Sequence, residues 1–222
     1  MRQNIVFRFF AATFVILSVA VSAQEIGAKK PDGSRYSIQV FSPEGDNWDF
    51  GAGLDARWYF WESEKNGSKI AFTTGFSLWD AKNERGTMPV DDVVVDVAIE
   101  GDALLWPVGL SVSQVFDISP DVSLILEAGA SYVVVSSNVT GEAYATDGMD
   151  SLYLKDTIYI DDSFVGQVSA DVLWNLNEKS SLSLGIGYQF DITKGDVSWW
   201  DTDIGENEFG ALFVQVGVAL HI

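Results

Sequence analysis

Apolar and polar residues alternate along eight segments of this chain. Side chains of a strand point alternately to its two faces, so each segment can be divided into two sets by parity. The set that contains the segment ends has 43 apolar residues out of 46, and the other set has 10 out of 38. This period-two pattern predicts eight strands. They are Tyr36 to Val40, Phe50 to Phe60, Ile70 to Leu78, Leu104 to Phe116, Val122 to Val134, Phe164 to Trp174, Leu182 to Ile192 and Leu212 to Ile222.

The less apolar face indicates how these strands are arranged. It carries glycines, serines and the charged residues Asp55, Arg57, Glu127 and Asp171. Small and charged side chains line a membrane barrel, whereas its apolar band contacts lipid. A soluble lipocalin-like barrel would have the reverse arrangement, and an antiparallel sandwich also alternates. A soluble fold would expose the apolar faces of eight strands to water. We therefore predict an all-β fold, an eight-stranded antiparallel up-and-down transmembrane β-barrel.

The links between the segments alternate in length. Those at 61–69, 117–121 and 175–181 are short, and those at 79–103, 135–163 and 193–211 are long. Short periplasmic turns and long extracellular loops are typical of outer-membrane barrels. Val93 to Ile99 and Leu152 to Ile160 are an alternative extra strand pair that would make ten strands. We favour eight strands with extensions into the loops.

Aromatic residues cluster near the predicted strand ends, where they would form two interfacial girdles. Tyr59 and Phe213 instead fall on the inner face. The outer girdle is predicted to contain Trp48, Phe50, Trp79, Tyr132, Phe164 and Phe190, and the inner one Trp58, Phe60, Phe116 and Trp174.

The first residues are typical of an exported protein. Arg2 and Arg8 precede an apolar core from Phe9 to Val21, and small residues follow up to Ala23. We therefore expect a signal peptide over residues 1–23, a short periplasmic segment over 24–34 and the transmembrane barrel domain over 35–222.

Charge and cysteine content exclude several classes of function. Residues 24–222 contain 11 basic and 32 acidic residues, so this part of the chain would repel nucleic acid and attract cations. The chain has no cysteine, which excludes disulfides and thiolate metal sites.

Three stretches resemble the small outer-membrane β-barrel superfamily, the OmpA/OmpX/OmpW-like group. They are Leu104 to Leu110, Leu126 to Tyr132 and Ser183 to Phe190. The resemblance implies a Gram-negative outer membrane, contact with lipid and lipopolysaccharide, and a monomer.

The C-terminal residues resemble the signal that the barrel-assembly machinery reads in this group. The matching positions are Gln215, Gly217, Leu220 and Ile222, with isoleucine where the group usually has phenylalanine. The same residues also fit the last strand of the barrel.

One layer of the predicted lumen contains charged side chains. Asp55, Arg57, Glu127, Asp171 and Gln215 all lie about five to seven residues from the turn end of their strands. Buried charges require partners, and Arg57 is the only base that the segments place inside. We expect Arg57 to bridge Glu127 and Asp171, as a plug that fixes the fold or as a gate for small solutes. An eight-stranded barrel is barely wide enough for its own side chains, which favours the plug.

Acidic residues are concentrated in the long links. Solvated surface is the usual interpretation of such charge, and Ca²⁺ or Mg²⁺ binding is the alternative. Asp201, Asp203 and Asn207 have oxygen ligands at alternate positions but lack the complete calcium-loop pattern. We predict no other cofactor.

Little in the sequence indicates catalysis. His221 is the only histidine, and it lies at the predicted periplasmic rim. A lipid A acyl transferase or deacylase would need a base beside a nucleophile, nearer the outer leaflet. We predict a non-enzymatic barrel with a structural or surface-interaction role. A narrow OmpW-like channel for small or apolar solutes is the alternative, and a lipid A-modifying enzyme is the third possibility.

Overall fold

The computed structural model describes residues 28–29, 33–44, 47–63, 67–90, 93–146, 151–200 and 202–221. No helix in these ranges is long and apolar enough to cross a bilayer. The predicted signal peptide and most of the predicted periplasmic segment lie outside the described residues. Those two assignments stay predictions.

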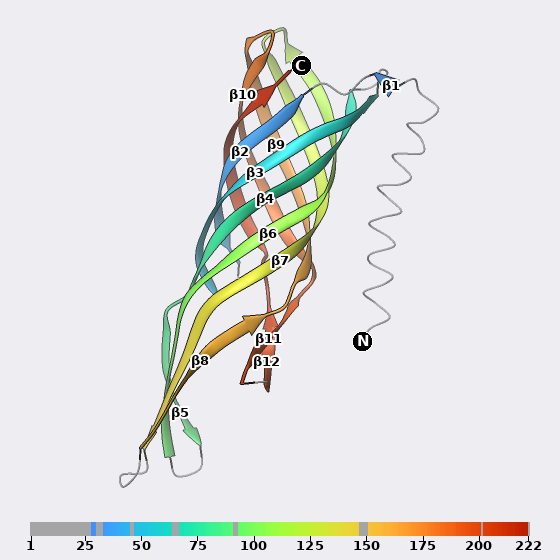
Figure 1. Ribbon diagram of the computed structural model, residues 1–222. Coiled ribbons are helices and arrows are strands. Elements are labelled where there is room, and N and C mark those ends of the chain that lie inside the picture. Colours follow the sequence, from blue (N-terminus) through green and yellow to red (C-terminus); the bar gives the residue numbers. More distant parts are fainter. Residues whose placement is uncertain are drawn as a thin grey trace.

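Eight antiparallel strands close a barrel (Figure 1), which confirms the predicted fold. Closure is made where the last strand pairs with the first along ten residue pairs, from Ala211 and Pro43 to Leu220 and Ser34. In order around the barrel, the strands are β2 (Ser34–Pro43), β3 (Trp48–Ser63), β4 (Ser68–Ala81), β6 (Val93–Ser119), β7 (Val122–Thr146), β9 (Ser163–Asn177), β10 (Ser180–Thr193) and β13 (Ala211–Leu220).

Five further strands do not take part in barrel closure. One of them, β1 (Ala28–Lys29), pairs with β3. The other four join the outer halves of β6 and β7 in a sheet beyond one end of the barrel, which we call the strand extension (Figure 1). These four are β5 (Glu84–Val90), β8 (Ser151–Ile160), β11 (Gly195–Trp199) and β12 (Thr202–Asn207). The opposite end of the barrel, where β6 joins β7, is the turn end.

The ten-strand alternative is wrong. Val93 to Ile99 belongs to β6 itself, and Leu152 to Ile160 belongs to β8, which pairs with β7 rather than with that segment. The partner of β7 changes along its length, from β9 up to Val133 to β8 from Val139 onward. The long links are therefore largely β-structure, because β6 and β7 continue as one ladder past the barrel.

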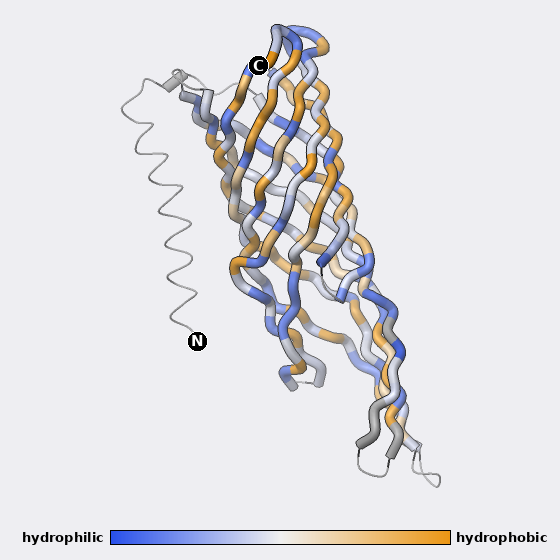
Figure 2. The backbone as a smooth tube through the Cα atoms, turned by 180° about the vertical axis from the view of Figure 1, so that it is seen from behind, coloured by the Kyte–Doolittle hydropathy of each residue, from blue (hydrophilic) through white to orange (hydrophobic). Residues whose placement is uncertain are grey.

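The apolar face of the strands points outward, as predicted. Residues such as Ile38, Phe76 and Val214 are half-exposed, and the two colours of Figure 2 alternate along the strands. Two of the three exceptions on this face have a structural reason. Gly166 lies under the ring of Phe190 on the neighbouring strand, which fills the space that a side chain would take.

The second exception, Thr74, compensates for a proline. Pro107 cannot donate to the β4–β6 ladder, and the residue pairing skips from Thr74 to Ser77 at this point. The Thr74 hydroxyl donates to the Pro107 carbonyl at 3.0 Å and accepts a bond from Trp106 Nε1, also at 3.0 Å. Lipid offers no other partner for these groups, so Thr74 satisfies them within the wall. The third exception, Gln114, accepts a hydrogen bond from Ser68 near the turn end.

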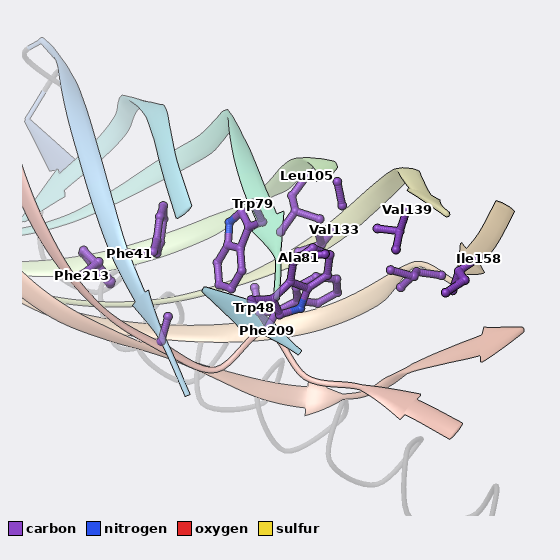
Figure 3. Packing of buried hydrophobic residues seen from close by; sticks show 14 residues of the cluster. Phe41, Trp48, Trp79, Ala81, Leu105, Val133, Val139, Ile158, Phe209 and Phe213 are labelled. Carbon is purple, nitrogen blue, oxygen red and sulfur yellow. The ribbon is translucent and has the colours of Figure 1, made fainter. Parts of the chain in front are cut away.

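The lumen contains three layers. A small apolar cluster of Ile125, Leu173 and Ala219 occupies the turn end. Charged and amide side chains fill the middle, and a larger apolar cluster fills the end next to the strand extension (Figure 3). Most apolar residues that the sequence places on the inner face belong to these two clusters. The lumen is thus occupied by packed side chains along its length.

The predicted outer girdle needs a correction. Trp48 and Trp79 are 3% and 0% exposed and lie inside the larger apolar cluster (Figure 3), not at the lipid interface. Trp79 has the parity of Ser77, an inner position, so alternation outweighs its place at the strand end. Phe50, Tyr132 and Phe190 are exposed as the girdle requires.

Candidate functional site: a closed lumen

The middle layer holds two arginines, not one. Arg35 and Arg57 are each 1% exposed, so the prediction that Arg57 is the only internal base is wrong. Arg35 lies one residue before the predicted start of the first strand, whereas β2 begins at Ser34. The same parity rule that placed Ser37 and Gln39 inside would have found it, had the segment been extended by one residue.

Arg57 has other partners than expected. Its Nη1 lies 3.3 Å from Asp55 Oδ2, and its Nε lies 2.7 Å from Glu127 Oε1. Asp171 pairs instead with Arg35, whose Nη1 lies 3.2 Å from Asp171 Oδ2. With two guanidinium groups facing three carboxylates, the surplus of negative charge is one rather than two.

Glu127 joins the two halves of this network. Arg35 and Arg57 are direct cross-strand partners in the β2–β3 pairing. Like charges in that position repel. Glu127 reaches across from β7, on the other side of the barrel, and its two oxygens contact one arginine each, at 3.0 Å from Arg35 Nη2 and 2.7 Å from Arg57 Nε. This carboxylate therefore ties opposite walls of the lumen together.

Gln215 extends the network with neutral groups. Its Nε2 donates to Asp171 Oδ1 at 2.6 Å, and its Oε1 accepts a bond from Gln39 Nε2 at 3.0 Å. Gly185 lies between Asp171 and Gln215 and pairs with both in register. A Cβ atom at Gly185 would overlap the Asp171 carboxylate, so glycine is needed there to let the two side chains meet.

Aromatic rings close the lumen next to the strand extension. Trp79 packs with its ring centroid 5.3 Å from Phe41, 6.0 Å from Trp48 and 5.7 Å from Phe209 (Figure 3). Phe213 adds a further ring at 5.7 Å from Phe41. The rings come from β2, β3, β4, β13 and the segment before β13. We call these five residues the aromatic plug.

Two of the three candidate metal ligands, Asp203 and Asn207, lie within the described residues, and they have different surroundings. Asn207 is 2% exposed, and its Oδ1 accepts bonds from Trp48 Nε1 and Asn47 Nδ2. Asp203 is exposed and accepts a bond from the backbone of Gly205. Asp201 lies outside the described residues, and within them no group of three or more acidic or histidine side chains has metal-site geometry.

The C-terminal signal residues occupy both faces of β13. Gln215 is in the lumen, as described above. Gly217 is also on the inner face, where a side chain would overlap the backbone of Tyr36. Leu220 is 42% exposed on the outer face, and Ile222 lies outside the described residues. Recognition by the assembly machinery stays a prediction.

His221 has a hydroxyl neighbour that the sequence did not indicate. Its Nε2 lies 2.8 Å from Ser181 Oγ, which also donates to Asn175 Oδ1 at 2.7 Å. Ser181 is 0% exposed, so its oxygen offers a substrate no access. This group joins the turn ends of β9, β10 and β13.

Several solved structures share this architecture. OprG from Pseudomonas aeruginosa superposes with a TM-score of 0.51 at 11% identity, covering 88% of this chain and 98% of that one. Neisserial surface protein A (NspA) gives a TM-score of 0.49 at 16% identity, covering 88% and 99%. No family model and no curated protein matches the sequence.

The closed barrel, its outward apolar band and the likeness to OprG define the fold. The chain has the fold of the small outer-membrane β-barrels and crosses the membrane with its strands.

Proposed function

We propose that the protein is a non-enzymatic barrel of the Gram-negative outer membrane that acts at the cell surface through its strand extension. One observation carries the proposal: the β6–β7 ladder runs from the turn end to the pair of Val94 and Thr146. A strand crosses a bilayer with about 9–11 residues, whereas β6 and β7 have 27 and 25. The surplus builds an ordered surface outside the membrane.

The packing of the lumen supports a role outside it. The network around Glu127 and the aromatic plug block the barrel at two successive levels. Near Gln39 and Gln167, the side chains of the lumen leave a space of about 30 Å³ between them. That space is about one water molecule in size.

The charge of the strand extension suggests its partner. Carboxylates on the extension outnumber its basic residues. Lys155 of β8, and Lys194 directly before β11, are each engaged with glutamates. A surface of one sign attracts the opposite sign, so a basic macromolecule or surface is the expected partner. The described acidic residues are Asp96, Glu100, Glu142, Asp156, Asp196, Asp203 and Glu206.

A trimmed variant tests this proposal. It replaces residues 84–99 and 140–157 by short turns, which removes β5, most of β8 and the outer ends of β6 and β7 but leaves the parts of β6 and β7 that pair with β4 and β9 in the barrel. In nanodiscs of zwitterionic lipid, the wild type should bind an oligolysine-coated surface in a salt-dependent manner, and the trimmed variant should not. The control neutralises Asp117, Asp121 and Glu178 at the turn end and should bind like the wild type. Equal binding by the trimmed variant would contradict the proposal.

The ion pairs also support a second candidate, a gated passage for small solutes. Arg57 contacts Asp55 and Glu127 together, so it has an alternative partner if one contact opens. Single-channel recording of wild type and Arg57→Ala tests this. A gate predicts rare openings that become frequent in the variant, and two equally silent traces would eliminate it.

A further inference from the structure

A half-open cavity lies outside the barrel lumen. It measures about 180 Å³ and lies between the mouth of the barrel and the β11–β12 hairpin. Val139, Ile158 and Ile160 line it from β7 and β8, and Val197 and Ile204 line it from the hairpin. Trp48, which stacks on Phe209 of the aromatic plug at 5.9 Å, also borders the space. Figure 3 shows Val139 and Ile158 beyond the plug, on the side of the strand extension.

One buried amide in this lining is only half satisfied. Asn207 Oδ1 accepts bonds from Trp48 Nε1 at 3.0 Å and Asn47 Nδ2 at 3.3 Å. Asn207 Nδ2 is buried and has no hydrogen-bond partner within the described residues. A buried donor without a partner costs free energy, so an acceptor that paired with it would be favoured. The two donated bonds to Oδ1 fix which end of the amide is free.

We propose that this cavity binds a small uncharged molecule with an aromatic or short aliphatic body and one carbonyl or ether oxygen. A cavity of about 150 Å³ is large enough for benzene, so this space has the size for a ring with one small substituent. Eight of the 13 lining residues are apolar, and the others include the oppositely charged Lys82 and Glu206. A charged ligand body would lose hydration against the apolar side chains, which favours an uncharged one. Asn207 Nδ2 donates to the ligand oxygen, and the side chains of the hairpin and of β8 enclose its body. This site does not depend on the proposed surface interaction, since it needs no basic partner.

A fluorinated probe tests the site directly. 4-Fluoroacetophenone is titrated into the protein in lipid nanodiscs and followed by ¹⁹F NMR, with empty nanodiscs as the reference for partition into lipid. The proposal predicts saturable binding and a shift of the Trp48 indole N–H resonance. A titration that is linear and equal to that of empty nanodiscs overturns it.

Two variants separate this site from nonspecific uptake. Asn207→Asp keeps an acceptor for Trp48 and Asn47 but removes the free donor, and should weaken binding about tenfold. The same change should leave 4-fluorotoluene, which has no acceptor, bound as before. Unchanged affinity of 4-fluoroacetophenone in Asn207→Asp contradicts the proposal.

A substitution that fills the space gives the second test. Ile204 is 50% exposed, so Ile204→Trp can occupy the cavity from its open side without disturbing the barrel. Saturable binding should disappear in this variant. Ile118→Trp is the control, because Ile118 is 65% exposed near the turn end and away from the cavity. Binding that survives Ile204→Trp would place the probe elsewhere and refute the site.

Discussion

Arg35 and Arg57 face each other on adjacent strands of the barrel, and both guanidinium groups are buried. Two like charges in direct register are tolerated here because Glu127 contacts both of them from the opposite wall. The stability of the barrel should therefore depend more on this one carboxylate than on any ion pair at its surface.

Glu127→Gln should destabilise the barrel by about 3–5 kcal/mol, since removal of one partner leaves buried charge uncompensated. The measurement is the temperature at which the heat-modifiable band shift occurs, together with urea unfolding in lipid. Glu142→Gln, which breaks an exposed ion pair of the strand extension, is the matched control and should leave the transition in place. Replacing Arg57 by Met together with Glu127→Gln should recover part of the loss. Additive losses in the double variant would contradict the coupling.

Gly185→Ala should separate Asp171 from Gln215, because the added methyl group overlaps the carboxylate. We expect a loss of about 1–3 kcal/mol, the usual cost of overpacking. Gly86→Ala is the control, since nothing lies within 4 Å of a Cβ at that position. Urea unfolding measures the stability of both variants. Equal unfolding free energies would show that the close approach at Gly185 has no energetic role.

Thr74→Val should destabilise the barrel. The variant leaves the Pro107 carbonyl and the Trp106 indole N–H without their partner in lipid. A loss of about 1–3 kcal/mol is expected for an unsatisfied buried polar group. Thr73→Val, on the neighbouring position of the same strand, serves as the comparison. Should both variants unfold alike, Thr74 would not compensate for the proline.

Trp79→Ala should remove the centre of the aromatic plug without making the barrel conduct. Loss of a fully buried indole costs about 3–5 kcal/mol. The layer around Glu127 remains closed below it, so planar-bilayer recordings should stay silent. Conductance in this single variant would show that the plug alone closes the lumen.

The contact between Lys155 and Glu142 should be lost at acid pH. Their hydrogen bond lowers the pKa of Glu142 below its ordinary value and raises the pKa of Lys155. A lowered carboxyl pKa means that the contact is complete at neutral pH and is lost as the pH falls through that lowered value. NMR titration of Glu142 should show its pKa rise in Lys155→Met. An unchanged value in that variant would mean that the two side chains do not meet in solution.

The sequence alone predicted the barrel because its evidence is repeated in every strand. The predicted outer face is apolar at 43 of its 46 positions. Two of the three exceptions have a local role: Thr74 donates a hydrogen bond to the Pro107 carbonyl, and Gly166 leaves room for the Phe190 ring. The site was harder to predict. Alternation tells which side chains point inward, but the pairing of Arg35 with Asp171 depends on strand stagger and barrel closure. Neither is encoded in any single segment.

The strand extension was underestimated for a related reason. Segments such as Glu84 to Val90 are acidic or contain proline, and they lack a clear apolar face. Their β-structure comes from pairing with β6, which is a tertiary effect. Trp48 and Trp79 were misplaced because an aromatic residue at a strand end fits a lipid girdle and a luminal plug equally well.

The strand extension differs from the barrel in one further respect. Within the described residues, the barrel is a closed cylinder, whereas the extension ends in β5 on one side and β12 on the other. Open strand borders invite pairing with another chain, and natural proteins discourage it with charge. Asp203 and Glu206 lie on β12. In a densely populated membrane, repulsion between the acidic β12 strands of neighbouring copies would keep these strands from pairing into one larger sheet.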